Sequence, residues 1–215
     1  MIRLLVVDDH QLVRMGISRL LADVKGIEVI GQAASGEEAI DMVRDLSPDV
    51  VLMDVKMPGI GGLEATRRSL RIDPDLKIIA VSVYDDEPFP SRLMSAGAVG
   101  YLTKGTNLEE MIRAIKKVHA GQRYISSDIA QQLALKPFTH EGASPFDALS
   151  SREMQITLMV INGLRVQEIS TNLSLSPKTV NSYRYRIFEK VHVKGDVELT
   201  KLAIKHSIID AEAVA

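Results

Sequence analysis

The sequence predicts an α/β domain with a doubly wound parallel sheet, followed by a smaller domain built only from helices. Short apolar runs alternate with amphipathic segments through about the first 120 residues. No strand pattern returns after about residue 150, and a segment with two prolines and no periodicity separates the two patterns. Five successive βα units are typical of an open parallel sheet with helices on both faces.

Five apolar runs have the composition of strands that are buried on both faces of a sheet. These runs are residues 3–7, 28–33, 50–53, 77–81 and 99–102. We expect the strand order 2-1-3-4-5. Capping boxes predict two helix starts between these strands, at Ser35 with Glu38 and at Thr106 with Glu109.

The region after the last predicted strand is expected to contain one helix over residues 122–134 and a linker over 135–149. Ser150 and Glu153 form a third capping box, which opens a helix that ends near Gly163. Further helices are predicted over residues 166–173, 177–190 and 197–205. Four helices without strands indicate an all-α second domain.

Composition narrows the possible functions. The chain has 215 residues, 46% of them hydrophobic, which is enough for two buried cores. It has no cysteine, which excludes disulfides, thiolate zinc sites and cysteine nucleophiles. The apolar start is too short for a signal peptide, and no run approaches the roughly 20 residues of a membrane span. We therefore expect a cytoplasmic protein that does not interact with membranes.

Polar residues follow the strands of the α/β domain, each at the carboxyl end. Asp8 and Asp9 follow the first strand, Asp54 the third, Ser82 the fourth and Lys104 the fifth. Open α/β sheets bind ligands at this edge. A single aspartate after a strand often caps a helix, and a single lysine is often solvated, but five such residues at matching strand ends predict one pocket.

Three neighbouring carboxylates repel one another unless a cation joins them, and Mg²⁺ is the hard ion that suits carboxylates and phosphate. An aspartate beside Mg²⁺ can act as a nucleophile toward a phosphoryl donor. The transferred group needs its oxygens neutralised, and Lys104 and the Ser82 hydroxyl are candidates for this role.

Four segments of the first 120 residues resemble the receiver domains of two-component response regulators in order and spacing. The segments read VVDDH, LMDVKMPGIGGLE, AVSVYDD and GYLTKG. The resemblance implies a flavodoxin-like (βα)5 fold, Asp54 as the acceptor of a phosphoryl group, and a sensor histidine kinase as its donor. It also implies Mg²⁺ ligands from Asp9, Asp54 and the backbone carbonyl of Lys56, with Asp8 acting through water.

The same resemblance implies a conformational switch. Ser82 would move onto the phosphoryl group and Tyr101 would turn inward, although a tyrosine near a strand also packs in cores for structural reasons alone. The chain departs from the family after Ser82, where Pro88 and Pro90 should shorten the fourth helix.

Basic residues are concentrated late in a chain whose net charge is only −2. Residues 176–194 contain five lysines or arginines and one glutamate. Ser176 and Pro177 predict the start of a helix that buries Val180, Tyr183 and Ile187. Its opposite face would read base edges through Lys178, Asn181, Ser182 and Tyr185. DNA phosphates would be contacted by Lys178, Arg184, Arg186 and Lys190.

The segment LSSRE followed by NGLRVQEISTNLSLSPKTVNSYRYRIFEKVHV resembles the LuxR-type helix-turn-helix of NarL/FixJ response regulators, and TVNSYRYRIFEK resembles their GacA/UvrY/VarA branch. This implies binding of double-stranded DNA, with the last helix forming a homodimer contact or closing the core. We predict a receiver over residues 1–121, a helix and linker over 122–147, and a helix-turn-helix domain over 148–215.

The predicted function is that of a transcription regulator whose DNA binding is controlled by phosphorylation, and not of an enzyme. Two alternatives remain open. A hydrolase of the haloacid dehalogenase type also uses an aspartate nucleophile and Mg²⁺, but it needs a second carboxylate where this chain has Lys56. The second alternative is an interaction module that never accepts phosphate and that has a basic helical docking domain.

Overall fold

The computed structural model describes residues 1–82, 89–127, 129–131, 144–206 and 208–209. The chain divides into two compact units, residues 1–139 and 140–215. Each unit is described by itself below.

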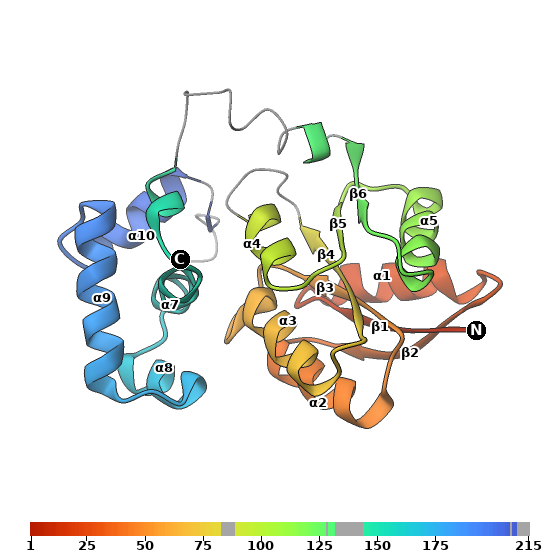
Figure 1. Cartoon of the computed structure of the whole chain (residues 1–215), viewed down its shortest axis with the longest axis horizontal. Helices are drawn as coiled ribbons and strands as arrows, with labels where there is room; N and C mark the ends of the chain where they lie inside the picture. The colour runs from red at the N-terminus through yellow and green to blue at the C-terminus, as the bar shows by residue number, and fades with distance from the viewer. Residues whose placement is uncertain (83–88, 128, 132–143, 207, 210–215) are drawn as a thin grey trace. The chain divides into compact units, whose positions relative to one another are not determined.

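The first unit contains a parallel sheet of six strands in the order β2-β1-β3-β4-β5-β6 (Figure 1). The strands are β1 (Ile2–Val7), β2 (Ile27–Ala33), β3 (Val50–Asp54), β4 (Lys77–Ser82), β5 (Gly100–Thr103) and β6 (Tyr124–Ile125). The predicted order of the first five strands is confirmed. The predicted α/β class is also confirmed, because buried apolar strands alternate with helices along the chain.

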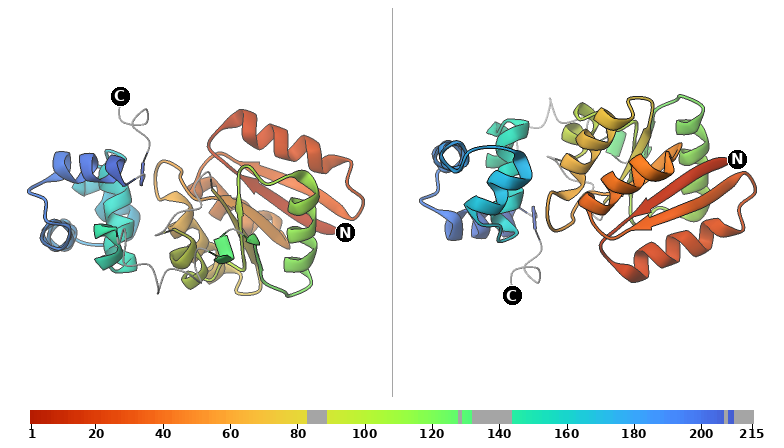
Figure 2. Two further views of the ribbon diagram at one scale, coloured as in Figure 1. Left: turned by 90° about the horizontal axis from the view of Figure 1, so that it is seen from above. Right: turned by 90° about the horizontal axis from the view of Figure 1, so that it is seen from below.

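Helices lie on both faces of this sheet (Figures 1 and 2). They are α1 (Gln11–Ala22), α2 (Gly36–Leu46), α3 (Gly61–Ile72), α4 (Phe89–Ser95) and α5 (Leu108–His119). Leu21 of α1 and Ile115 of α5 share one hydrophobic core with Leu4, Leu52 and other strand residues. Within the described residues, α4 has seven residues with Pro90 at its second position, which agrees with the predicted shortening, while Pro88 lies outside the described residues.

Two predictions about this unit are wrong in detail. The helix α5 is capped by Asn107, whose Oδ1 accepts from the backbone N–H of Glu110 at 2.9 Å, so it begins after the predicted cap at Thr106. The predicted helix over 122–134 is interrupted by β6. This strand pairs with β5, and Tyr101 lies opposite Ile125 in the pair. Residues 127 and 129–131 are helical, and 128 and 132–134 lie outside the described residues.

The described part of the second unit contains helices and no strand. Its elements are η2 (Pro145–Ala148), α7 (Ser151–Ile161), α8 (Val166–Leu173), α9 (Pro177–Val191) and α10 (Asp196–Lys205). The Ser150–Glu153 capping box is present, and Gly163 follows α7 with a φ of +81°. The linker prediction is wrong at its end: Phe146 is fully buried, and its ring meets His206 edge-on.

None of the helices in the described part of the chain is long and apolar enough to cross a membrane.

Candidate functional site

The carboxyl ends of four adjacent strands bring the predicted pocket residues together. Asp54 is the last residue of β3 and Ser82 the last of β4. Asp8 follows β1 and donates its backbone N–H to Ala33 of β2, while Lys104 follows β5 and donates its backbone N–H to Ser82. Because all these ladders are parallel, the side chains gather at one edge of the sheet.

An ammonium group lies between two buried carboxylates in this pocket. Lys104 Nζ is 2.7 Å from Asp8 Oδ2 and 2.9 Å from Asp54 Oδ2. Asp8 and Asp54 are each only 2% exposed. The predicted convergence of these side chains is therefore present in the folded chain.

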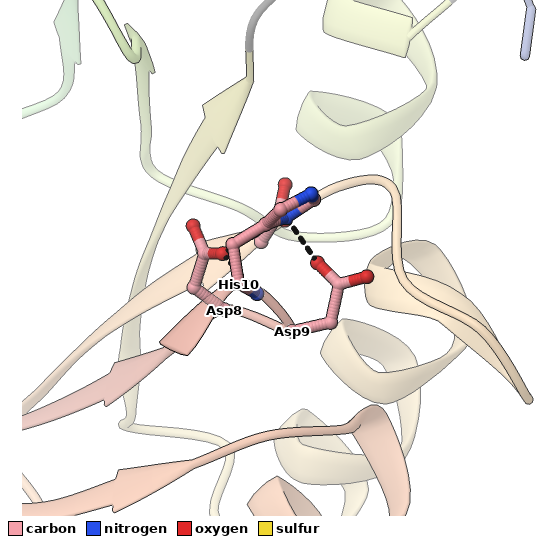
Figure 3. Close-up of side chains that lie close together, drawn as sticks. Asp8, Asp9 and His10 are labelled. Atoms are coloured by element: carbon pink, nitrogen blue, oxygen red, sulfur yellow. Dashed lines mark hydrogen bonds and ion pairs between the residues drawn. The ribbon is translucent and has the colours of Figure 1, made fainter. Parts of the chain in front are cut away.

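Asp9 and His10 complete the rim of the pocket (Figure 3). His10 Nδ1 is 2.9 Å from Asp9 Oδ1 and 3.5 Å from Asp8 Oδ1, and the His10 backbone N–H donates to Asp8 Oδ1. One ligand atom each from Asp8, Asp9, His10 and Asp54 falls within a span of 4.8 Å. Sequence reasoning missed His10, although its position directly after two aspartates could have revealed it.

Burial controls the electrostatics of the acceptor carboxylate. It raises the pKa of Asp54 from 3.8 to about 7, against the opposing effect of Lys104 and with help from the charges of Asp8 and Asp9. Burial by itself would lower the pKa of Lys104, but Asp54 and Asp8 outweigh burial and raise it. The pocket thus favours a bound positive charge.

The donor set of the pocket suits a hard divalent cation. Three carboxylates converge there, and Asp9 Oδ1 faces the ring of His10, which carries a positive charge only when it is protonated. Carboxylate oxygens at this spacing are the ligands that Mg²⁺ and related ions prefer. A cation would also offset the repulsion that raises the pKa of Asp54.

The loop after Asp54 passes very close to the acceptor's own backbone. A Cβ atom on Gly62 would lie 2.0 Å from the carbonyl oxygen of Asp54, so only glycine fits there. Gly62 N–H donates to the carbonyl of Val55, while Gly59 and Gly61 have φ of +75° and +69°. These glycines let the chain turn away from the pocket and enter α3.

The remaining residues predicted for the pocket lie around Asp54. The backbone N–H of Lys56 donates to Asp54 Oδ1 at 3.3 Å. Ser82 is 1% exposed at the neighbouring strand end. Tyr101, the residue that the family resemblance assigns to the switch, is fully buried in β5.

In the second unit, α9 presents the basic face predicted from the sequence. Ser176 Oγ accepts from the backbone N–H of Thr179 and Pro177 is the first helical residue. Val180 and Ile187 are buried as predicted, while Tyr183 is half-buried under the guanidinium of Arg186. Five of the seven predicted contact residues are exposed, namely Lys178, Ser182, Tyr185, Arg186 and Lys190.

Two predicted DNA contacts of α9 bind carboxylates within their own unit. Lys190 Nζ lies 2.7 Å from Glu153 Oε2, and Arg184 Nη2 lies 2.5 Å from Asp196 Oδ2. Glu153 is 3% exposed. Burial alone would raise its pKa, but hydrogen bonds from Lys190 and Ser150 outweigh burial and lower it.

Family models match both units of the chain. Residues 4–116 match the response regulator receiver domain, and residues 147–203 match the luxR family of bacterial regulatory proteins. The chain therefore belongs to the NarL/FixJ family of two-component response regulators, which join these two domains. Members of this family are DNA-binding transcription regulators and not enzymes, so the predicted class of function is confirmed.

Relatives of high identity extend over the whole chain. The chain is 62% identical to response regulator GacA of Pseudomonas aeruginosa, over 98% of this chain and 99% of that protein. It is 56% identical to response regulator UvrY of Escherichia coli K12, over 100% of this chain and 99% of that protein. The predicted similarity to GacA and UvrY is confirmed.

Solved structures share the fold. A LuxR-family two-component response regulator from Aurantimonas sp. SI85-9A1 is 37% identical, with a TM-score of 0.62, over 65% of this chain and 99% of that one. RcsB of Salmonella enterica serovar Typhimurium, bound to promoter rprA in the presence of the phosphomimetic BeF₃⁻, is 22% identical with a TM-score of 0.73. That match covers 97% of this chain and 100% of RcsB, and it shows likeness of fold alone.

Proposed function

We propose that Asp54 accepts a phosphoryl group from a sensor histidine kinase and that this modification controls DNA binding by α9. One observation carries the first half of the proposal. The carboxylate of Asp54 is buried at the carboxyl edge of the sheet, 2.9 Å from Lys104 Nζ and beside Asp8 and Asp9. Such a carboxylate is a nucleophile with a fixed position and a counter-charge at hand.

The chemical step is in-line transfer to a carboxylate oxygen. A bond forms between Oδ of Asp54 and phosphorus as the bond from phosphorus to the kinase histidine nitrogen breaks, leaving an acyl phosphate. The ammonium of Lys104 neutralises charge on the phosphoryl oxygens, and the hydroxyl of Ser82 donates a hydrogen bond to one of them. Ser82 ends β4, the strand next to β3, and Lys104 follows β5 with its Nζ 2.9 Å from Asp54 Oδ2.

Asp9, Asp54 and the backbone carbonyl of Lys56 would hold a Mg²⁺ ion, with Asp8 acting through water. When bound, the ion neutralises charge on the acceptor carboxylate and on the phosphoryl oxygens. Asp8 meanwhile orients Lys104 through their 2.7 Å ion pair. We assign Ser82 and Tyr101 to the switch that follows phosphorylation.

The second half of the proposal places α9 in the major groove of double-stranded DNA. Its exposed face offers Lys178, Ser182, Tyr185 and Arg186. Asn181, Arg184 and Lys190 belong to the same predicted surface. RcsB, which has this fold, is bound to a promoter in a solved complex, and another solved structure contains two RcsB dimers on two DNAs. We propose that this chain also binds as a homodimer.

We further propose that the protein acts in the cytoplasm, since its target is chromosomal DNA. We place the receiver at residues 1–121, as predicted from the sequence, with β6 at the start of the connecting segment pairing onto its sheet. The DNA-binding domain was predicted to begin at residue 148, but we now begin it at Pro145, because Phe146 belongs to its core.

The proposal is tested by phosphorylation with a small donor. We expect incubation with acetyl phosphate and Mg²⁺ to add one phosphate-sized mass to the full-length protein, and Asp54→Ala to abolish the adduct. Glu64→Gln is a matched control, because Glu64 is a buried carboxylate of the same unit that pairs with Arg68 instead. Failure of the wild type to form the adduct contradicts the proposal, and rapid turnover of phosphate monoesters favours the hydrolase instead.

A further inference from the structure

A chain of polar contacts runs from α10 to the exposed face of α9. Arg184 Nη2 contacts Asp196 Oδ2 at 2.5 Å, and Arg184 Nη1 donates to Asn181 Oδ1 at 3.1 Å. Asp196 is the first residue of α10, whereas Asn181 lies one turn before Arg184 on α9. The arginine therefore connects a carboxylate of one helix to a predicted base-reading side chain on the other.

The chemistry of arginine determines which end of the Asn181 carboxamide points outward. A guanidinium group has only donors, so the atom of Asn181 that it contacts must be the oxygen. The carboxamide is planar, and its NH₂ group lies opposite the oxygen. Asn181 is half-buried at the border between the packed face and the exposed face of α9, so its NH₂ group is the part left for DNA.

Arg184 is itself held in this position. Its side chain is 22% exposed, whereas its neighbour Arg186 belongs to the exposed face of α9. The guanidinium also lies 5.7 Å from the centre of the Phe188 ring. An arginine that pairs with Asp196 and covers Phe188 is a weaker candidate for a phosphate contact than the exposed basic residues of α9.

We propose that the Asp196–Arg184–Asn181 chain sets the base preference of α9 by presenting Asn181 to DNA as a donor only. This inference rests on the proposed placement of α9 in the major groove. A free asparagine pairs with adenine by donating to N7 and accepting from N6. With its oxygen turned toward Arg184, the NH₂ group of Asn181 matches guanine instead, because guanine presents two acceptors, N7 and O6, at that edge.

The experiment begins with selection of binding sites from a duplex library with randomised positions, using the full-length protein treated with acetyl phosphate. Affinities are then measured for all four bases at each position of the selected site. The position at which Asn181→Ala removes the preference is the base pair that Asn181 reads. There we expect the wild type to bind guanine on the order of tenfold more tightly than adenine.

Two variants release the carboxamide without touching it. Arg184→Met removes the donor, and Asp196→Asn keeps the arginine but removes its charged anchor. Both should reduce the preference for guanine over adenine at that position to about threefold or less, while preferences elsewhere stay unchanged. Arg186→Met is the matched control: it should weaken binding to all sequences alike and leave the preference intact.

The outcomes separate this inference from the proposed function. If Arg184→Met weakens every sequence equally and lowers the salt dependence by about one counterion, Arg184 is a phosphate contact and the inference is wrong. A wild-type preference for adenine at the Asn181 position also overturns it. If the selection enriches no sequence, or if Asn181→Ala and Tyr185→Ala leave binding unchanged, the placement of α9 in the groove is wrong and the inference fails with it.

Discussion

The two sites of this protein place charge in opposite environments. In the acidic pocket, Asp8 and Asp54 are each 2% exposed and share the ammonium of Lys104. On the outer face of α9, Tyr185 is 72% exposed and Lys178 is also exposed. Charge in the pocket is therefore coupled to the stability of the fold, whereas the face of α9 can vary with little effect on stability.

The loop after Asp54 should show the largest effect of a single substitution on stability. We expect Gly62→Ala to destabilise the first unit by about 3 kcal/mol, because the new Cβ would meet the backbone of Asp54 at 2.0 Å and neither backbone can move freely. Hydrogen exchange of peptides from β3 and α3 measures the loss, and phosphorylation by acetyl phosphate should fall with it.

Gly16→Ala is the control for the same substitution elsewhere in the unit. Gly16 lies within α1, and nothing is within 4 Å of a Cβ at that position. That variant should stabilise the unit by about 0.5 to 1 kcal/mol. A neutral Gly62→Ala would mean that the loop is not held against Asp54 as described.

The buried carboxylate of Asp54 should lower the free energy of unfolding at neutral pH when no metal is bound. Because the pKa of Asp54 is raised from 3.8 to about 7, the folded state binds a proton more tightly than the unfolded state. Its contribution to stability is therefore lost as the pH rises from about 4 to above 7. The full shift in the pKa of Asp54 corresponds to at most about 4 kcal/mol in the free energy of unfolding. Neutralising Asp54 gains less than this, because Lys104 then loses a partner carboxylate.

We expect Asp54→Asn to stabilise the EDTA-treated protein by about 2 kcal/mol at pH 8 and to change stability little at pH 4. Denaturant unfolding of the full chain at both pH values, followed through the first unit by hydrogen exchange, provides the measurement. Addition of Mg²⁺ should stabilise the wild type at pH 8 more than the variant. Equal effects of the substitution at the two pH values would contradict the raised pKa.

The sequence predicted the pocket well because its signal is local and repeated. Each of Asp8, Asp54 and Ser82 directly ends or follows an apolar run, and parallel strands necessarily bring these ends together. Other features depend on packing that no short pattern records. The strand β6 has two residues, too few for a period, and Phe146 lies in a segment whose composition is that of a linker.

The exact start of a helix is also difficult to predict from the sequence. Thr106 and Asn107 each precede an acidic residue by three positions, so either could cap α5, and the fold uses Asn107. On α9, four basic residues look alike in sequence. Which of them pair within the unit depends on Glu153 and Asp196, which lie 37 residues from Lys190 and 12 from Arg184.

Substitution of Lys190 tests whether its ion pair with Glu153 stabilises the second unit. We expect Lys190→Met to destabilise the second unit by about 1 to 2 kcal/mol, because it leaves the buried carboxylate of Glu153 without its cation. Since the pKa of Glu153 is lowered, its contribution is present above pH 4.5 and is lost as the pH falls through the lowered pKa. The loss should therefore shrink in acid.

Hydrogen exchange in α7 and α9 at several pH values measures this effect. Combining Lys190→Met with Glu153→Gln should recover part of the stability, because no unpaired charge remains buried. Arg186→Met, at an exposed position of the same helix, is the control and should change stability by less than about 0.5 kcal/mol. If Lys190→Met and Arg186→Met behave alike, the pair with Glu153 does not stabilise the unit.

Tyr185 should show the smallest effect on stability and a clear effect on binding. Its side chain is 72% exposed, so Tyr185→Ala removes little buried surface and should change the free energy of unfolding by less than about 0.5 kcal/mol. The same change should weaken DNA binding measurably if this face enters the groove, because an exposed aromatic ring of a recognition helix can contact base edges and methyl groups. If Tyr185→Ala lowers the free energy of unfolding as well as DNA binding, Tyr185 is a packed residue, and the contrast between the two sites is wrong.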